Sequence, residues 1–180
     1  MARSPATPYW SASSRATAYA TGPVLPAPLL VDPDTYRACL DGLDERLEAM
    51  AALGCTVATT VLNPRSPLAT LEARALARER IAHLADAAET HGVRLAVEAV
   101  SVRDGLPPDL DGPHPVADSL PALDELLHET KTGNAGVLAD SFHWAAADRS
   151  QLPQLWRHVP PARQSLADLR AVQGIVRDRP

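Results

Sequence analysis

The chain has 180 residues, a formal charge of −5 at pH 7, and 46% hydrophobic and 22% charged residues. These values predict one globular domain with a sizeable core. The acidic balance and the scattered Lys and Arg residues argue against nucleic acid as a partner. No apolar run approaches the roughly 18 residues that cross a membrane, so no membrane partner is expected.

The cysteine content indicates the compartment. Cys39 and Cys55 are far apart and fit no metal or redox spacing. Both lie in apolar surroundings, which favours buried, reduced thiols in a cytoplasmic protein.

The first 31 residues differ in composition from the rest of the chain. Residues 1–31 are rich in Ala, Ser, Thr and Pro and lack the apolar centre of a secretory signal. We expect a flexible leader here, with an organelle transit peptide as the alternative on composition. The ordered domain is then expected over residues 32–170, followed by a tail over 171–180.

The first helix–strand unit is expected to begin at Asp32-Pro33, a cap followed by a proline suited to the first helical turn. Apolar residues then recur at helical spacing on one face, at Tyr36, Leu40, Leu43, Leu47 and Met50. Gly54 is expected to end this single helix. The Val- and Thr-rich run 55–62 predicts a strand, which Asn63-Pro64 ends.

A second unit follows with the same order. Ser66-Pro67 predicts a capped helix whose buried stripe comprises Ala73, Leu76, Ala77, Ile81, Leu84 and Ala88. Gly92 ends the helix, residues 93–97 form a strand, and Glu98 stands at its carboxyl end. The proline-rich stretch 101–118 is long for a connection inside a domain, and such loops are often functional.

Two further units complete the pattern. Ser119 is expected to start a helix that buries Leu120, Leu123 and Leu127 and ends at Gly133. The small apolar run 135–139 suits a strand buried on both faces, followed by Asp140 and His143. A short helix over 150–159 and a strand over 163–167, ending at Asp168, come last.

This alternation of helices and strands predicts an α/β fold with a parallel sheet and right-handed crossovers. Two architectures fit the pattern: an open doubly wound sheet, or part of an eight-stranded (β/α) barrel. The sequence has neither a GxGxxG nor a GxxxxGK[ST] motif, so a nucleotide-binding sheet loses its best support.

Carboxylates end three of the predicted strands, at Glu98, Asp140 and Asp168. That is the arrangement of a site on one rim of a parallel barrel. Oxygen ligands with a nearby imidazole, here His143, suit a divalent ion such as Mg²⁺, Mn²⁺ or Co²⁺. The alternative for each acid is a helix cap or a solvated loop residue.

Four segments carry a resemblance to a known family. The run 85–98 (ADAAETHGVRLAVE) resembles the segment before the first metal-binding glutamate of the sugar phosphate isomerase/epimerase family, the xylose-isomerase-like barrel group. The run 134–143 (NAGVLADSFH) resembles its glycine–strand–Asp-x-x-His signature. Residues 50–55 resemble its helix-to-strand entry, and residues 165–168 resemble a later strand. The likeness covers roughly residues 34–170.

The resemblance implies a partial TIM-type barrel of about four helix–strand units and a role for each site residue. Glu98 would bind a divalent metal (Mn, Co, Mg or Zn) and act as acid and base beside a substrate carbonyl. Asp140 would be a second metal ligand. His143 would contact substrate or move protons, with Trp144 and Asp168 as further substrate-binding residues. Trp144 could equally plug the barrel rim.

The expected activity is therefore that of a metal-dependent sugar (phosphate) isomerase or epimerase with a sugar or polyol substrate. Ser165 departs from the family pattern, because the resemblance implies His or Gln at that position. The resemblance also implies strands before and after those found here, so we expect a barrel incomplete at both ends, with edges covered by self-association or by a partner. The alternative is an inactive barrel fragment or binding protein. A repair nuclease of the same barrel class is disfavoured by the acidic balance.

Overall fold

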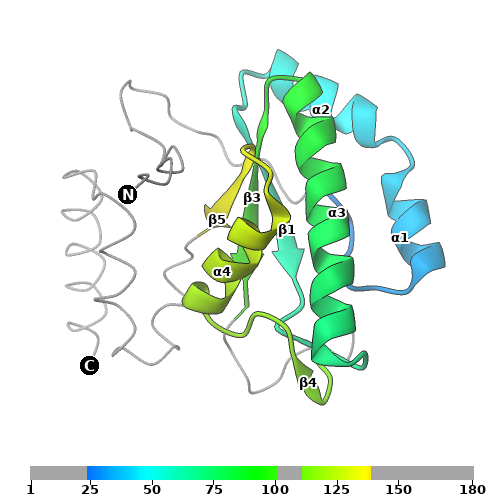
Figure 1. Ribbon diagram of the computed structural model, residues 1–180. Coiled ribbons are helices and arrows are strands. Elements are labelled where there is room, and N and C mark those ends of the chain that lie inside the picture. The colour runs from blue at the N-terminus through cyan, green and yellow to red at the C-terminus, as the bar shows by residue number, and fades with distance from the viewer. Residues whose placement is uncertain (1–23, 101–110, 139–180) are drawn as a thin grey trace, which may run out of the picture. The chain divides into compact units, whose positions relative to one another are not determined.

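The computed structural model describes residues 24–100 and 111–138, all within the compact unit formed by Thr17–Arg149. Its elements follow the chain in alternating order (Figure 1). They are α1 (Pro33–Leu40), α2 (Leu43–Ala52), β1 (Val57–Leu62), β2 (Arg65–Ser66), α3 (Thr70–Thr90), β3 (Arg94–Ala99), β4 (His114–Pro115), α4 (Leu120–Thr130) and β5 (Ala135–Leu138).

The central sheet is parallel, as the alternation predicted. Its strand order is β1-β3-β5, with Thr60 opposite Val97 and Val97 opposite Val137. Helix α3 connects β1 to β3, and α4 connects β3 to β5. A separate antiparallel pair joins β2 to β4. The α/β class is therefore confirmed for the part of the chain that the structure describes.

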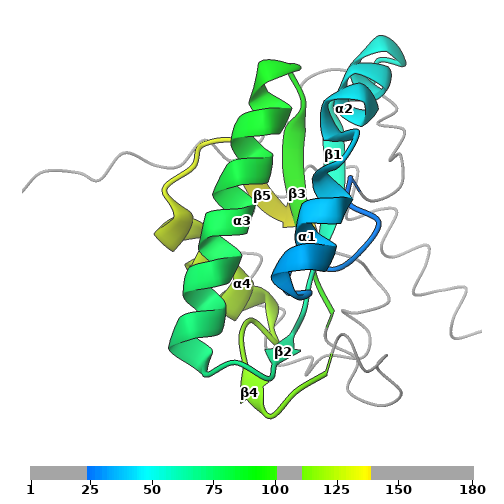
Figure 2. The same ribbon diagram turned by 90° about the vertical axis from the view of Figure 1, so that its right-hand side faces the viewer.

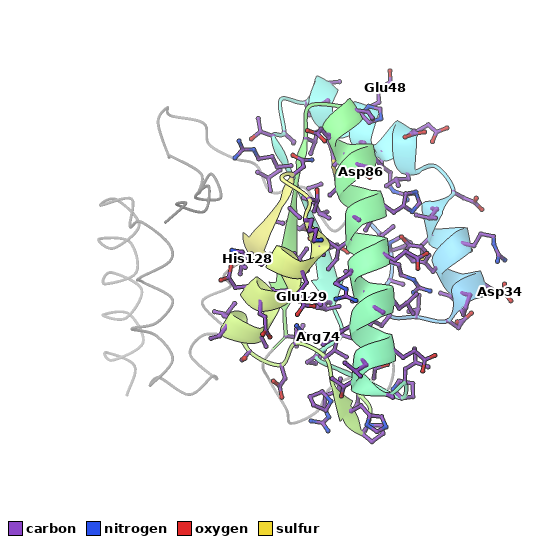
Figure 3. All side chains as sticks on the ribbon, viewed as in Figure 1. Asp34, Glu48, Arg74, Asp86, His128 and Glu129 are labelled. Atoms are coloured by element: carbon purple, nitrogen blue, oxygen red, sulfur yellow. The ribbon has the colours of Figure 1, made fainter. Side chains whose placement is uncertain are left out.

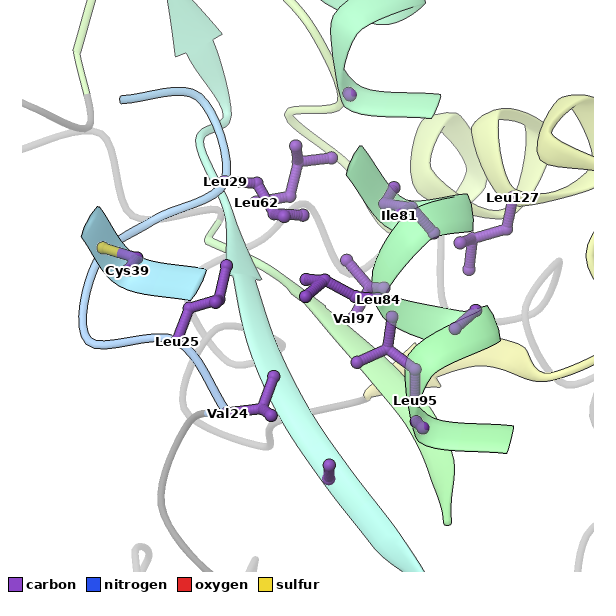
Figure 4. Packing of buried hydrophobic residues seen from close by; sticks show 14 of the residues in the cluster. Val24, Leu25, Leu29, Cys39, Leu62, Ile81, Leu84, Leu95, Val97 and Leu127 are labelled. Atoms are coloured by element: carbon purple, nitrogen blue, oxygen red, sulfur yellow. The ribbon is translucent and has the colours of Figure 1, made fainter. Parts of the chain in front are cut away.

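The helices and the sheet share one hydrophobic core. Helix α3 lies between α4 and α1 in Figure 1, and Figure 2 shows α1 and α2 together on one side of α3. Ile81 and Leu84 of α3 are buried with Leu95 and Val97 of β3 in this core (Figure 4). The members of the predicted α3 stripe that are buried are Ala73, Ala77, Ile81, Leu84 and Ala88.

The first helix differs from its prediction, because the structure has two helices where one was expected. Helix α1 ends at Leu40, and Gly42 precedes α2 with a φ of 69°. That left-handed conformation suits glycine and breaks the helix. Leu40 and Leu43 nevertheless pack on the same core, which explains why the apolar spacing continued through the break.

The predicted start of the next helix was also wrong. Ser66 belongs to β2, and its Oγ accepts a hydrogen bond from the amide of Leu68. Helix α3 begins at Thr70 instead. The later boundary was predicted well, since Gly92 follows α3 with a φ of 68°. The Ser119 cap of α4 is likewise confirmed, because its side chain accepts from the amide of Ala122.

The residues just before α1 belong to the core, although the sequence analysis began the ordered domain at Asp32. We call residues 24–31 the edge segment, because they run along the outer edge of β1. Val24 and Leu29 donate their amides to the carbonyls of Thr59 and Val61, at 2.7 and 2.9 Å. Three of its side chains, Val24, Leu25 and Leu29, are at most 1% exposed (Figure 4).

A buried arginine fixes this segment to α3. Arg80 is only 3% exposed, and its Nη1 donates to the carbonyls of Leu29 and Val31 at 2.5 and 2.7 Å. Its guanidinium also stacks on the ring of Tyr36 in α1, 4.0 Å from the centroid. Burial lowers the pKa of Arg80 and raises that of Tyr36 to about 12. Arg80 therefore connects α3, the edge segment and α1 through a single side chain.

Ion pairs join α3 to α4 at the surface. Arg74 contacts Glu129 at 2.9 Å (Figure 3) and Glu125 at 3.2 Å. Arg78 contacts Glu129 at 2.9 Å. Arg74 also donates to the carbonyl of Val116. The hydrogen bond from Arg74 lowers the pKa of the Glu129 carboxyl. This network holds α4 against α3.

Both cysteines are buried and free, as their surroundings predicted. Cys39 lies in α1, and its carbonyl accepts a hydrogen bond from Arg46. Cys55 lies between α2 and β1 and is 5% exposed. Among the described residues, no helix combines the length and the apolar character needed to span a bilayer.

Replacing Arg80 by Met should lower the free energy of unfolding by about 2–4 kcal/mol, because two buried carbonyls lose a charged donor. Chemical denaturation of Arg80→Met measures this loss. The control is Arg78→Met on the exposed side of the same helix, which should cost less than about 1 kcal/mol. Equal losses in the two variants would show that Arg80 contributes no more than a surface arginine.

Glu129 should make the stability depend on pH in the acidic range. Its pKa is lower in the folded chain than in the unfolded chain, so its stabilisation is complete above the ordinary glutamate pKa of about 4.3. That stabilisation is lost as the pH falls through the lowered folded value. In Glu129→Gln, the unfolding free energy should therefore fall less steeply on acidification than in the wild type.

The control for this measurement is Glu48→Gln, which alters an exposed carboxylate of α2 (Figure 3). It should follow the wild-type profile. If Glu129→Gln also follows that profile, the ion pairs of Glu129 contribute nothing measurable to stability.

Candidate functional site

Parallel strands bring their carboxyl ends to one edge of a sheet, where α/β proteins build their sites. Glu98 is the penultimate residue of β3 and therefore lies at this edge. The register sets it opposite Val61 of β1 on one side and Leu138 of β5 on the other. The partly buried carboxylate thus stands between two apolar neighbours.

Glu98 belongs to the face of the sheet that turns away from the helices. Side chains alternate along a strand, and Leu95 and Val97 are members of the core beneath α3. Ala96 and Glu98 have the opposite parity, and neither is in that core. In a parallel barrel, the face opposite the helices is the interior.

The layer next to Glu98 on this face is made of small residues. Thr59, Ala96 and Gly136 are opposite one another in the register, one layer toward the amino ends of the strands. Val61, Glu98 and Leu138 form the layer above. Glu98 is the only ionisable residue in these two layers of the described sheet.

A buried asparagine, which the sequence analysis treated only as the end of a strand, organises the same edge. Asn63 directly follows β1 and is 2% exposed. Its Oδ1 accepts the amide of Leu30 at 2.7 Å. The side chain therefore ties the end of the edge segment to the carboxyl end of β1.

The long stretch after β3 is also anchored at this edge. We call β2, β4 and the contacts of Arg65 the rim clamp. Arg65 donates from Nε to the carbonyl of Gly112 at 2.6 Å and from Nη2 to that of Pro113 at 2.5 Å. The amide of Val116 donates to the carbonyl of Pro64 at 2.9 Å. The residues after β1 and those before α4 are thereby held together.

Gly112 makes this approach possible. A Cβ atom at this position would lie 2.3 Å from the carbonyl carbon of Ser66 and 2.5 Å from its oxygen. Only glycine allows two backbones to come so close. The Gly112-Pro113 pair within a proline-rich stretch was the sequence signal for this anchor, and it was interpreted only as part of a loop.

The structure tests the position of one predicted site residue. Glu98 is at the expected edge, whereas Asp140, His143, Trp144 and Asp168 lie outside the described residues. Ser165, which departs from the family pattern, lies outside them too. Within residues 24–100 and 111–138, no three His, Cys, Asp or Glu side chains gather in a way that could hold a metal ion.

Comparison with known proteins identifies the architecture. The sequence model of the family described as "Xylose isomerase-like TIM barrel" matches residues 17–174, which is most of the chain. The match includes all described residues and every predicted site residue. It also begins before the edge segment. No curated protein matches the sequence.

Solved structures agree with this result. A xylose isomerase domain protein from Alicyclobacillus acidocaldarius subsp. acidocaldarius is 25% identical, with a TM-score of 0.56, over 67% of this chain and 42% of that one. An IolI protein with a binding zinc atom is 20% identical, with a TM-score of 0.51, over 63% and 38%. A D-psicose 3-epimerase in the presence of D-fructose is 20% identical, with a TM-score of 0.52, over 69% and 42%. The chain thus covers less than half the length of each.

The rim clamp should not tolerate a side chain at position 112. In Gly112→Ala, the added methyl group collides with backbone atoms, so the clamp must shift, at a cost of about 1–3 kcal/mol in unfolding free energy. Amide exchange of residues 64–66 and 111–116 should accelerate in this variant.

Gly133→Ala is the matched control, because a Cβ there would meet nothing within 4 Å. It should change stability by less than about 0.5 kcal/mol. If Gly112→Ala behaves like this control, the close approach of the two backbones does not exist in solution.

Proposed function

Because the chain belongs to the xylose isomerase-like TIM barrel family, we propose that it is a divalent-metal-dependent isomerase or epimerase of a sugar or related polyol. The observation that carries this proposal is the position of Glu98. It supplies a carboxylate at the carboxyl edge of the sheet, on the face away from the helices. A reacting group is needed there in a parallel barrel.

The alternation of side chains along β5 supports a second carboxylate on the same face. Gly136 and Leu138 share the face of Glu98, and Asp140 follows Leu138 by two residues. The pairing of Leu138 with Glu98 brings β5 beside β3. We therefore assign Glu98 and Asp140 as the two carboxylate ligands of one site.

The donor set fits a hard or borderline divalent ion. Carboxylate oxygens suit Mg²⁺ and Mn²⁺, and a nearby imidazole such as that of His143 extends the choice to Co²⁺ and Zn²⁺. When bound, such an ion would supply Lewis-acid polarisation of a substrate carbonyl. The similarity to an IolI protein with a binding zinc atom supports this choice at the level of the family.

Glu98 is the residue that we assign to proton transfer. A carboxylate can remove a proton from the carbon beside a polarised carbonyl and return it to another position or face. Val61 and Leu138 flank it, and their apolar side chains limit the access of water to a proton that it carries. His143 is assigned to contact a substrate oxygen or to move a proton, with Trp144 and Asp168 as substrate-binding residues.

The substrate class is proposed from the chemistry and from the neighbouring folds. An epimerase of this type needs a carbonyl beside a carbon that carries a hydroxyl group, as in a ketose. The similar structure of a D-psicose 3-epimerase supports ketohexoses as the first compounds to test. Ser165 motivates the alternative, a sugar-binding protein without turnover, because serine is a poor metal ligand.

Calorimetric titration with Mn²⁺ and Co²⁺ tests the proposed ligands. Glu98→Gln and Asp140→Ala should each weaken binding at least about tenfold, because each removes a charged oxygen ligand. The control Glu48→Gln should bind as the wild type does. Unchanged affinity in both site variants would show that these carboxylates do not bind the ion.

Proton transfer can be followed separately from binding. NMR in deuterated water should detect metal-dependent incorporation of deuterium beside the carbonyl of a ketohexose, and Glu98→Gln should abolish it. Metal binding without deuterium incorporation across a panel of ketoses would favour the sugar-binding alternative.

A further inference from the structure

The outer edge of β1 is covered from within the chain. The carbonyls of Thr59 and Val61 face away from β3 and accept the amides of Val24 and Leu29 in the edge segment. The carbonyl of Thr56 faces the other way and accepts the amide of Arg94 beside β3. Sheet edges covered by self-association or by a partner were expected, and on this side a segment of the same chain covers the edge.

Strand β1 would be prone to pair with other strands if its outer edge were exposed. Its sequence, VATTVL, contains no charged residue, no glycine and no proline, and four of its six residues are β-branched. Uncharged segments of high β-propensity pair readily with other strands when their backbone groups are exposed. The edge of β1 is therefore a surface to which a second copy of the same strand could bind.

Among the described residues, the edge segment does not continue the sheet as a regular strand. Between its two hydrogen bonds to β1 lie Pro26 and Pro28, which have no amide hydrogen to donate. From Val24 to Leu29 the segment advances five positions, whereas the acceptors Thr59 and Val61 are only two positions apart on β1, so the pairing is not that of a regular strand. With two residues that lack an amide hydrogen, the segment offers another strand an incomplete ladder of donors.

Three side chains from different elements hold the segment in place through its backbone. Arg46 of α2 donates from Nε to the carbonyl of Val24 at 3.0 Å. Asn63 accepts the amide of Leu30, and Arg80 donates to the carbonyls of Leu29 and Val31. Both ends of the segment are thereby fixed by contacts that do not depend on its side chains.

We propose that residues 24–31 act as an intramolecular cover that prevents β1 from pairing with β1 of a second copy of this chain. The partner follows from the chemistry of the edge. An uncharged, β-branched strand matches itself, and a symmetric pair brings the same surface of each copy together. The cover depends on the polar contacts of its backbone and on its two prolines.

The first test removes two of the contacts in the full chain. In the double variant Asn63→Ala/Arg80→Met, hydrogen exchange of residues 24–31 should accelerate at least about tenfold. Light scattering after size-exclusion chromatography should show a mass that rises with concentration beyond the wild-type value. Faster exchange without any rise in mass would overturn the proposal.

A destabilised control separates edge pairing from general aggregation. Leu84→Ala opens a cavity in the core and removes none of the hydrogen-bonding groups that hold the edge segment. The molecular mass of Leu84→Ala in solution should equal that of the wild type over the same concentrations. If it associates as strongly as the double variant, the association comes from lost stability and the proposal fails.

A second variant tests the proposed cover if the first does not fold. Pro26→Val/Pro28→Val adds two amide donors to the segment and leaves in place the residues Val24 and Leu29, whose amides bond to β1. It should self-associate more than the wild type, whereas Pro67→Ala, an exposed proline outside the segment, should not. A wild-type mass for Pro26→Val/Pro28→Val would show that the prolines do not block pairing.

Discussion

A single buried guanidinium holds the first half of this fold together. Arg80 is 3% exposed, and burying a charge is costly unless hydrogen bonds and a suitable partner compensate. Here two backbone carbonyls of the edge segment and the ring of Tyr36 provide part of that compensation, while Nε of Arg80 is buried without a hydrogen-bond partner among the described residues. Because α3 also connects β1 to β3, the contact of Arg80 sets the position of the edge segment, of α1 and of the sheet relative to one another.

The geometry of the candidate site depends on this arrangement of α3 and the sheet. Helix α3 fixes how β3 pairs with β1, and that register determines that Glu98 lies between Val61 and Leu138. Asn63 and the rim clamp then tie the segments around the carboxyl ends of the strands to the same scaffold. The proposed acid–base group therefore sits on a strand that neighbours support on both sides, and it does not depend on a loop for its position.

Periodicity predicted most of the fold, and the exceptions have physical reasons. Strands β1, β3 and β5, the buried stripe of α3 and the Ser119 cap were predicted because each depends on nearby residues, and the family match confirms the barrel class. The break at Gly42 was missed because apolar residues on both sides of it face one core. The edge segment was missed because prolines and small residues resemble a flexible leader, and its order depends on distant partners such as Arg80. Of the site, only the position of Glu98 could be compared.

The two buried cysteines are native probes of local opening in the unmodified chain. Cys39 lies in α1, where its carbonyl accepts a hydrogen bond from Arg46, and Cys55 lies in the connection from α2 to β1. A thiol that is 5 or 6% exposed reacts with a labelling reagent only when its surroundings open. The reaction rate of Cys39 therefore reports the loosening of α1, and that of Cys55 reports the separation of α2 from the sheet. The chain thus has two native thiols in different parts of its core, and their reaction rates report local opening without an engineered cysteine.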